Sequence, residues 1–319
     1  MVPFVSIGGR AGSAGNSRRG NANGSHRASA WRTAFASHFG WHGLSVPLPP
    51  FAQRMAGGEP HGLCMSPLLR VADVGVRFGG IVALERVSFD LHAGQMLGLI
   101  GPNGAGKTTL FNCFSRLYTP VEGDILFEGA SILDKPPHRM VEIGIGRTFQ
   151  NLALFARMSV LDNVRVGGHH VARSDFFSDA LHLPWVTRHE RALDDIAWEL
   201  IDYLDLHAVA HRPVADLPFG LQKRVELARA LAVKPKLLPL DEPAGGLNHV
   251  EVEELGRTIR RIRDERRVTV LLVEHHMNLV MSVCDRVVAL DFGRKIADGT
   301  PAEVQSNQDV IAAYLGTAA

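Results

Sequence analysis

The sequence predicts an α/β fold with a mixed β-sheet flanked by helices. Short apolar runs alternate with stretches of helical period along most of the chain. A glycine-rich loop, "GPNGAGKT" at 101–108, follows one apolar run and opens a helical stretch. A pair of acids, Asp241 and Glu242, follows a second apolar run much later. With the glycine loop early and the acids late, this order favours a sheet whose strand ends carry the chemistry.

Composition bounds what the chain can be. Its 319 residues, 46% of them hydrophobic, suffice for one large or two modest domains. With 34 basic and 33 acidic side chains, charge gives no argument for a nucleic-acid partner, and none is expected. The cysteines, Cys64, Cys113 and Cys284, lack metal-ligand spacing and leave one unpaired in any disulfide scheme, which favours a reducing compartment. The longest apolar runs, such as 268–273, are far shorter than the roughly 20 residues of a spanning helix.

Residues 1–64 differ from the rest of the chain. They are rich in Gly, Ser, Ala and Asn and hold several arginines against the single acid Glu59. No helical or alternating period persists there, so we expect a disordered leader outside the fold. An arginine-rich, acid-poor leader is compatible with an organellar transit peptide. The favoured interpretation places the natural start at Met65 and treats the leader as translated upstream sequence or a dispensable tail.

The first chemical motif is the loop at 101–108. The run Met96 to Ile100 supplies a strand before it, and a helix after it is expected to bury Leu110, Phe111, Phe114 and Leu117 on one face. Glycines let backbone N–H groups turn onto phosphates, and the helix N-terminus adds its dipole. Lys107 is predicted to reach the β and γ phosphates of a nucleotide, and the Thr108 hydroxyl to hold Mg²⁺. The predicted phosphate-binding residues are Gly101, Pro102, Asn103, Gly104, Ala105, Gly106, Lys107, Thr108 and Thr109.

The acid pair closes the strand predicted over Leu237 to Leu240. Asp241 at the strand end is predicted to bind Mg²⁺ directly or through water, and Glu242 to polarise the attacking water. The alternative, that the two acids only cap a following helix, is disfavoured by Pro243 and by the phosphate loop upstream.

Further segments complete a pattern that resembles the ATP-binding subunits of ABC transporters over about residues 68–316. These segments are "VRFGGIVAL" with Phe78, "GRTFQNLALF" with Gln150, "LPFGL" at 217–221, "GGLN" at 245–248 and "LLVEHHM" with His275. They occur in the family's order and at plausible spacing. The resemblance implies a P-loop ABC cassette, with a mixed-sheet core at 68–150 and 226–316 and a helical subdomain at 151–225, all within an ATP-binding domain at 65–319.

The resemblance also implies roles for single residues. Phe78, as the aromatic before the first strand, would stack on adenine. Gln150 would touch Mg²⁺ and sense the membrane subunits, and His275 would act as the switch histidine at the γ-phosphate. Hydrolysis would therefore use Glu242, His275 and Gln150, with Thr108, Gln150 and Asp241 around the metal. The signature loop that contacts ATP would be Leu217, Pro218, Phe219, Gly220 and Leu221.

The signature loop departs from the family's usual Leu-Ser-Gly-Gly-Gln. Pro218 stands in place of the serine and Leu221 in place of the glutamine. Each lost charge-assisted hydrogen bond is worth about 1.5–3 kcal/mol. Gly220 is predicted to open a helix whose N–H groups still point at an anion, with an apolar face that includes Val225 and Ala228. We therefore expect a weakened but functional loop.

Within the family, the loop variant and two longer segments resemble the larger ATPase subunit of branched-chain amino acid importers. The segments are "RTFQNLALFARMSVLDNVRVGGH" and "ADGTPAEVQSNQDVIAAYLG". This implies an ATPase peripheral to the cytoplasmic face of the inner membrane. Its implied partners are transmembrane permease subunits, a second ABC ATPase subunit and, indirectly, an extracytoplasmic solute-binding protein. An importer of urea or amides is the alternative of the same class.

Pro239 raises a further alternative. It lies inside the strand that leads to Asp241 and removes a backbone donor there, at an expected cost of about 1–3 kcal/mol together with a shifted register. We expect an impaired but active ATPase, a sequence error being the rival explanation of the proline. A nucleotide-sensing module without hydrolysis is a second reading. A soluble ABC ATPase of translation or DNA repair is a third, disfavoured because the chain has neither two cassettes nor a long coiled-coil insert.

Two other segments resemble functional motifs, but we expect both to have only a structural role. "ALDFGRK" at 289–295 contains Asp-Phe-Gly without a kinase catalytic loop, so it predicts a hairpin turn between strands 286–290 and 294–298. The arginines in "RTIRRIRDERR" at 257–267 alternate with acids and predict a solvated helix face.

Overall fold

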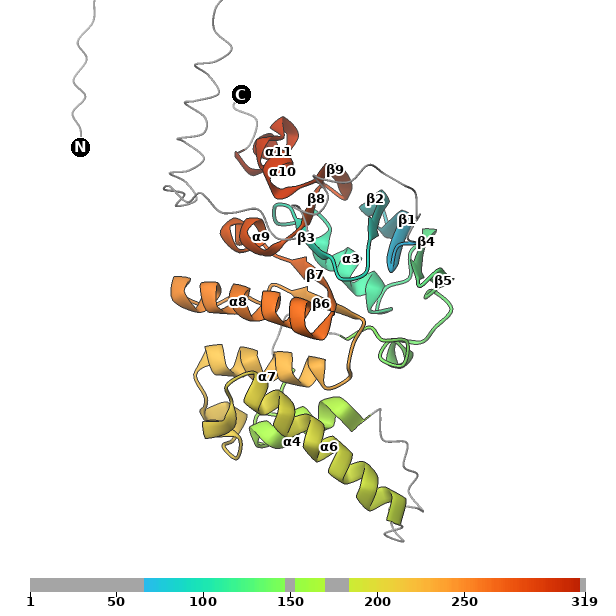
Figure 1. The fold of residues 1–319 in the computed structure, drawn as a ribbon. Helices are drawn as coiled ribbons and strands as arrows, with labels where there is room; N and C mark the ends of the chain where they lie inside the picture. The colour runs from blue at the N-terminus through green and yellow to red at the C-terminus, as the bar shows by residue number, and fades with distance from the viewer. Residues whose placement is uncertain (1–65, 147–152, 170–183, 316–319) are drawn as a thin grey trace, which may run out of the picture. The chain divides into compact units, whose positions relative to one another are not determined.

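The structure of the chain is a computed structural model that describes residues 66–146, 153–169 and 184–315 (Figure 1). For residues 184–189 it describes the backbone alone. The predictions for residues 1–64 and for Gln150 lie outside these ranges. All described residues belong to the unit Val46–Ala319.

The main sheet has the strand order β6-β7-β3-β8-β9. Its strands are β3 (Met96–Ile100), β6 (Leu237–Asp241), β7 (Thr269–Val273), β8 (Arg286–Asp291) and β9 (Arg294–Gly299). The first four in spatial order run parallel, and β9 runs antiparallel to β8, so the sheet is mixed as predicted. All residues of β3, β6 and β7 are buried, which explains their continuous apolar runs.

A second, antiparallel sheet was not expected. It comprises β1 (Leu69–Phe78), β2 (Ile81–Leu91), β4 (Glu122–Phe127) and β5 (Ala130–Ser131), in the order β2-β1-β4-β5. Its buried residues form one hydrophobic cluster with α3 (Lys107–Phe114) and with one set of main-sheet side chains. Leu110, Phe111 and Phe114 of α3 are buried there as predicted. Leu117 lies beyond the end of α3 and is 55% exposed, so its assignment to this face was wrong.

Helices cover the other set of main-sheet side chains. They include α8 (His249–Arg266), α9 (Met277–Val283), α10 (Pro301–Ser306) and α11 (Gln308–Leu315). The arginines of α8 are less solvated than expected. The guanidinium groups of Arg261 and Arg266 each lie 4.5 Å from the ring centre of Tyr203, and Arg263 forms an ion pair with Asp285. The arginine cluster therefore packs α8 against its neighbours.

The described part of 151–225 is mostly helical. It contains α4 (Val160–Gly168), α6 (Pro184–Tyr203) and the first half of α7 (Phe219–Leu231), with short 3₁₀ turns at His207–Val209 and Val214–Asp216. A further turn, Pro137–Arg139, precedes it. Helices α4, α6 and α7 pack together, and α7 meets α8 where Arg224 donates to Glu254 at 2.9 Å (Figure 1). None of the described helices has the length and apolarity to cross a bilayer.

Pro239 sits in β6 without disturbing the pairing with β7. Lys236 O accepts from Thr269 N, and Glu242 N donates to Val273 O. Hydrogen-bonding groups alternate along a strand, so the position of Pro239 faces the opposite side, where Leu237 N donates to Gly144 O. Of the described strands only β7 neighbours β6, and the register runs unbroken from Leu237 to Asp241. The predicted register shift was therefore wrong, and Pro239 removes no bond from the β6–β7 ladder.

Candidate functional site

The glycine-rich loop joins the end of β3 to the start of α3. Its backbone requires glycine at two positions. A Cβ on Gly101, at φ +150°, would meet Leu290 O at 2.3 Å, and one on Gly106, at φ +98°, would meet Ala83 O at 2.7 Å. Among the described residues no side chain caps α3, whose N-cap is Gly106, so its first N–H groups are left for the loop and a ligand.

The tip of the β8–β9 hairpin is hydrogen-bonded to this loop. Phe292 and Gly293 form its tip with φ +42° and +80°, the geometry of a two-residue turn, which confirms the predicted hairpin. Gly293 N donates to Ala105 O at 3.0 Å, which fixes the turn to the phosphate loop. The Asp-Phe-Gly letters therefore have a structural explanation.

Lys107 is the buried cation of the site, with 5% exposure. Its Nζ donates to Gly101 O at 2.7 Å and to Pro102 O at 3.1 Å. Burial lowers the pKa of Lys107, while Glu242, Asp241 and Glu274 act in the opposite direction. The carboxylates of Glu242 and Asp241 thus favour the charged form of Lys107, against the effect of burial. Thr108 is exposed and Thr109 half-buried at the start of α3.

Asp241 is the last residue of β6, and Glu242 follows it directly, as predicted. Asp241 is 3% exposed, while Glu242 has a left-handed backbone at φ +46°, which is costly for a residue with a side chain and is typical of functional positions. The helix-cap alternative is wrong because α8 begins at His249, and its N-cap Asn248 accepts from Val250 N and Glu251 N. The acids therefore have no role in starting α8.

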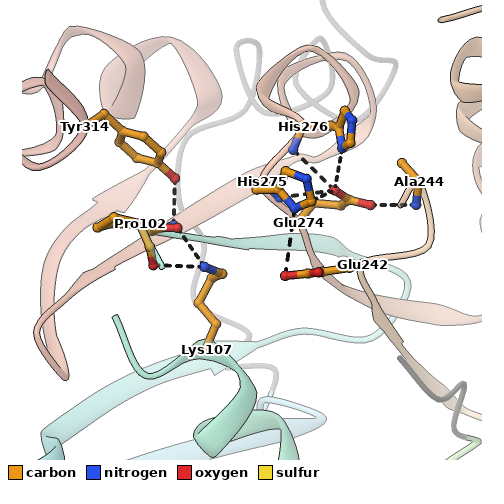
Figure 2. A network of polar contacts seen from close by, with 9 residues as sticks. Pro102, Lys107, Glu242, Ala244, Glu274, His275, His276 and Tyr314 are labelled. Carbon is orange, nitrogen blue, oxygen red and sulfur yellow. Dashed lines mark hydrogen bonds and ion pairs between the residues drawn. The ribbon is translucent and has the colours of Figure 1, made fainter. Parts of the chain in front are cut away.

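A pocket of about 400 Å³ unites the predicted phosphate loop, carboxylate and histidine. His275 Nδ1 lies 3.8 Å from a carboxylate oxygen of Glu242, and both groups line the pocket (Figure 2). The lining residues are Gly101, Pro102, Asn103, Glu242, His275 and Tyr314.

Tyr314 is a pocket residue that sequence reasoning missed. It lies on α11, and its hydroxyl accepts a hydrogen bond from Gly101 N at 2.8 Å. Burial raises the pKa of Tyr314 to about 12, so the hydroxyl is neutral at physiological pH. The signal in the sequence was a tyrosine inside the apolar stretch "VIAAYLG", more than two hundred residues from the loop that it contacts.

Glu274 is the second residue that was missed. It follows β7, is 0% exposed and accepts from Ala244 N at 2.7 Å, from His275 N at 3.1 Å and from His276 N at 3.2 Å (Figure 2). Its ligand atoms and those of His275 and His276 lie within 4.8 Å of one another, the spacing of a metal site. Because N–H groups already occupy both oxygens of Glu274, hydrogen bonding accounts for this cluster without a metal.

Phe78 is outside the phosphate pocket. It is the last residue of β1 rather than a residue before the first strand, which corrects the predicted placement. Phe78 is 45% exposed, and its ring meets the ring of Tyr118 edge-on, with the ring centres 5.1 Å apart. Phe78 is thus partly accessible to solvent.

The predicted signature loop lies elsewhere in the chain. Leu217 ends a 3₁₀ turn, Pro218 is the N-cap of α7, and the helix starts at Phe219, one residue before the glycine that was expected to open it. Pro218, Gly220 and Leu221 line a separate groove between α7 and α8. The Phe219 ring packs on the loop after Glu242, where a Cβ on Gly246 would lie 3.0 Å from it. Among the described residues, the pocket at the phosphate loop and the groove at the signature loop therefore have no lining residue in common.

Comparisons with known proteins agree with this geometry. The family model described as "ABC transporter" matches residues 84–245, and the model "Branched-chain amino acid ATP-binding cassette transporter" matches residues 294–319. The chain is 41% identical to the high-affinity branched-chain amino acid transport ATP-binding protein BraF of Pseudomonas aeruginosa, over 79% of this chain and 99% of the relative. It is 40% identical to the protein of the same description, LivG, of Escherichia coli K12, with the same coverage.

Solved structures give the same family. The ADP conformation of MJ1267, an ATP-binding cassette of an ABC transporter, aligns with a TM-score of 0.68 and 28% identity over 78% of this chain and 98% of that one. A nucleotide-free ATP-binding cassette from an ABC transporter aligns equally well, with a TM-score of 0.68. The phosphate loop, the acids that close β6 and these matches together show that the chain belongs to the ABC transporter family, as an ATP-binding cassette with ATPase function.

Proposed function

We propose that this chain energises an importer of branched-chain or related amino acids by hydrolysing ATP. One observation carries the catalytic part: a single pocket holds the phosphate loop, Glu242 and His275. The solute class is supported by the relatives BraF and LivG and by the match of residues 294–319. In this proposal residues 65–319 form the ATP-binding domain, with 68–150 and 226–316 as core and 151–225 as helical subdomain.

The roles of the pocket residues follow from their chemistry. The loop from Gly101 to Thr109 binds the phosphates through N–H groups and through Lys107. Glu242 orients and polarises the attacking water. His275, 3.8 Å from Glu242, donates to the γ-phosphate and links that phosphate to the base. Phe78 offers its exposed face to the adenine.

The donor set suits Mg²⁺. Thr108 offers a hydroxyl and Asp241 a carboxylate at the end of β6, and both are the hard oxygen ligands that Mg²⁺ takes. Gln150 completes this set in the proposal. Bound there, the metal would neutralise charge that develops on the transferred phosphate.

Two cassettes would be needed for a complete site. Within the described part of one chain, Pro218, Gly220 and Leu221 line the groove between α7 and α8, and none of them lines the pocket of Glu242 and His275. We infer that a second ABC subunit, identical or related, presents its signature loop head to tail. Membrane permease subunits would dock near Gln150 and carry the motion to the solute, with a solute-binding protein outside and the cassette on the cytoplasmic face.

The test is solute uptake by the reconstituted transporter. The full chain would be assembled in vesicles with its permease subunits and binding protein, and ATP-driven uptake of leucine, urea and acetamide would be compared. We expect leucine uptake that Lys107→Ala abolishes, because phosphate binding is lost. Uptake of urea or acetamide alone would replace the proposed solute class with the alternative, and leucine uptake unaffected by Lys107→Ala would contradict the energising role.

A further inference from the structure

We propose that Glu274 is a positioning residue that links the loop after Glu242 to the loop that carries His275. The link keeps the two loops in a fixed position relative to each other during hydrolysis. The inference rests on the proposed function, because it assigns Glu274 a part in the turnover of ATP at that pocket.

The hydrogen bonds of Glu274 divide between the two loops. Oε1 accepts from Ala244 N at 2.7 Å, two residues after Glu242. Oε2 accepts from His275 N at 3.1 Å and from His276 N at 3.2 Å, and lies 3.3 Å from His276 Nδ1 (Figure 2). One side chain thus holds backbone groups 30 residues apart in the sequence, on either side of the contact between Glu242 and His275.

The chemistry of these contacts requires a carboxylate. The three backbone partners are all N–H donors, so the side chain must present two acceptor oxygens. A glutamine would turn its NH₂ toward one set of donors and leave those N–H groups buried without an acceptor. Burying a charge to this degree costs stability, and such groups are explained better by the arrangement they fix than by the stability they add.

The loop that Glu274 holds also contacts the predicted signature loop, outside the pocket. The loop held at Ala244 continues to Gly246, which lies against the ring of Phe219 in the predicted signature loop. Glu274 therefore connects the loop of His275 with the signature loop that contains Phe219. In the proposed head-to-tail dimer these two loops serve different ATP sites. Its loss should impair the catalytic step more than the binding of ATP.

The experiment compares full-length Glu274→Gln with Asp285→Asn. Asp285 is also a buried carboxylate, 6% exposed, that accepts from a backbone N–H, at Met96, but it lies at the opposite end of β3 from the phosphate loop. We expect Glu274→Gln to lower kcat at least tenfold while the KM for ATP changes less than about threefold, because misplaced catalytic groups cost rate more than affinity. Asp285→Asn should keep the kcat of the folded fraction within about twofold.

Hydrogen exchange measures the link between the loop after Glu242 and the loop of His275. Hydrogen exchange of Glu274→Gln should show peptides 242–248 and 274–277 losing protection together, with little change elsewhere in the core. In a His275→Ala background, Glu274→Gln should add less than about a twofold further loss, since residues that act as a unit are not additive. Should Glu274→Gln fail to fold, Glu274→Asp, which keeps the charge but shortens the reach, takes its place in each assay.

Three results would overturn the inference: an unchanged kcat, a kcat that falls only in proportion to the unfolded fraction as in Asp285→Asn, or loss of protection confined to 274–277. A wild-type chain that binds no ATP or does not hydrolyse it would overturn the proposed function instead, and the exchange result for the two loops would still stand as a test of the link.

Discussion

At the scale of single residues, Pro239 lies in β6 without breaking its pairing with β7, so we expect it to be compatible with ATP hydrolysis. The proline faces away from β7, so we expect Pro239→Leu to change the free energy of unfolding by less than about 1 kcal/mol and turnover by less than about threefold. Its register partner Leu271 lies in β7, which has strands on both sides. Leu271→Pro should cost about 3 kcal/mol or more. Urea unfolding and ATP turnover of both variants measure this, and a large gain in turnover from Pro239→Leu would restore the impaired-enzyme hypothesis.

Tyr314 gives a pH signature of the link between α11 and the phosphate loop. Because its pKa is raised to about 12, its stabilising contribution is complete below pH 10 and is lost as the pH rises through 12. Tyr314→Phe should lower the free energy of unfolding by about 0.5–1.5 kcal/mol at pH 8 through loss of the Gly101 bond. The difference in the free energy of unfolding between the wild type and Tyr314→Phe should be smaller at pH 11. Urea midpoints at the two pH values test this, and a gap that stays constant would show that the hydroxyl is not buried as described.

At the scale of elements, Asp285 ties α8 to the main sheet. It accepts from Met96 N at 2.8 Å and forms an ion pair with Arg263 at 3.1 Å, with both side chains at most 10% exposed. Burial lowers the pKa of Arg263, but Asp264 and Asp285 outweigh it and raise the pKa overall. Asp285→Ala should cost about 3–5 kcal/mol because Arg263 is left buried without this partner.

The matched control for Asp285 is Glu85→Ala. Glu85 pairs with Arg294 at 2.7 Å, but the two side chains are 43% and 66% exposed. Solvent screens such a pair, so its loss should cost less than about 1 kcal/mol. Denaturant unfolding compares the two variants, and equal losses would contradict the assigned role of Asp285.

How far the sequence predicts each element depends on whether its signal is local. The strand, loop and helix from Met96 to Phe114 and the hairpin at 286–299 follow from apolar runs and glycine positions within a few residues. The antiparallel sheet was missed because bulges shift the register of β1 and β2 and interrupt the alternation of apolar residues. Glu274 and Tyr314 were missed because their partners, Ala244 and Gly101, lie far away in the sequence and only the fold brings them together.

At the scale of the whole molecule, the proposed dimer should depend on ATP. The separate positions of phosphate pocket and signature groove predict that ATP bridges two chains. We expect Glu242→Gln, which retains the phosphate-binding groups, to form dimers with ATP, detected by light scattering. Lys107→Ala should remain monomeric under the same conditions. A Glu242→Gln chain that binds ATP as a monomer at all concentrations would contradict the head-to-tail arrangement for two identical copies.

The most direct test of the whole account is steady-state ATP turnover of the full chain beside Glu242→Gln, with ATP binding measured for both. The account predicts Mg²⁺-dependent turnover by the wild-type chain, a loss of at least about 100-fold in Glu242→Gln, and similar ATP affinities. Equal turnover by the two chains would show that Glu242 is not the base. Binding without turnover in both would show that the chain senses ATP rather than hydrolysing it.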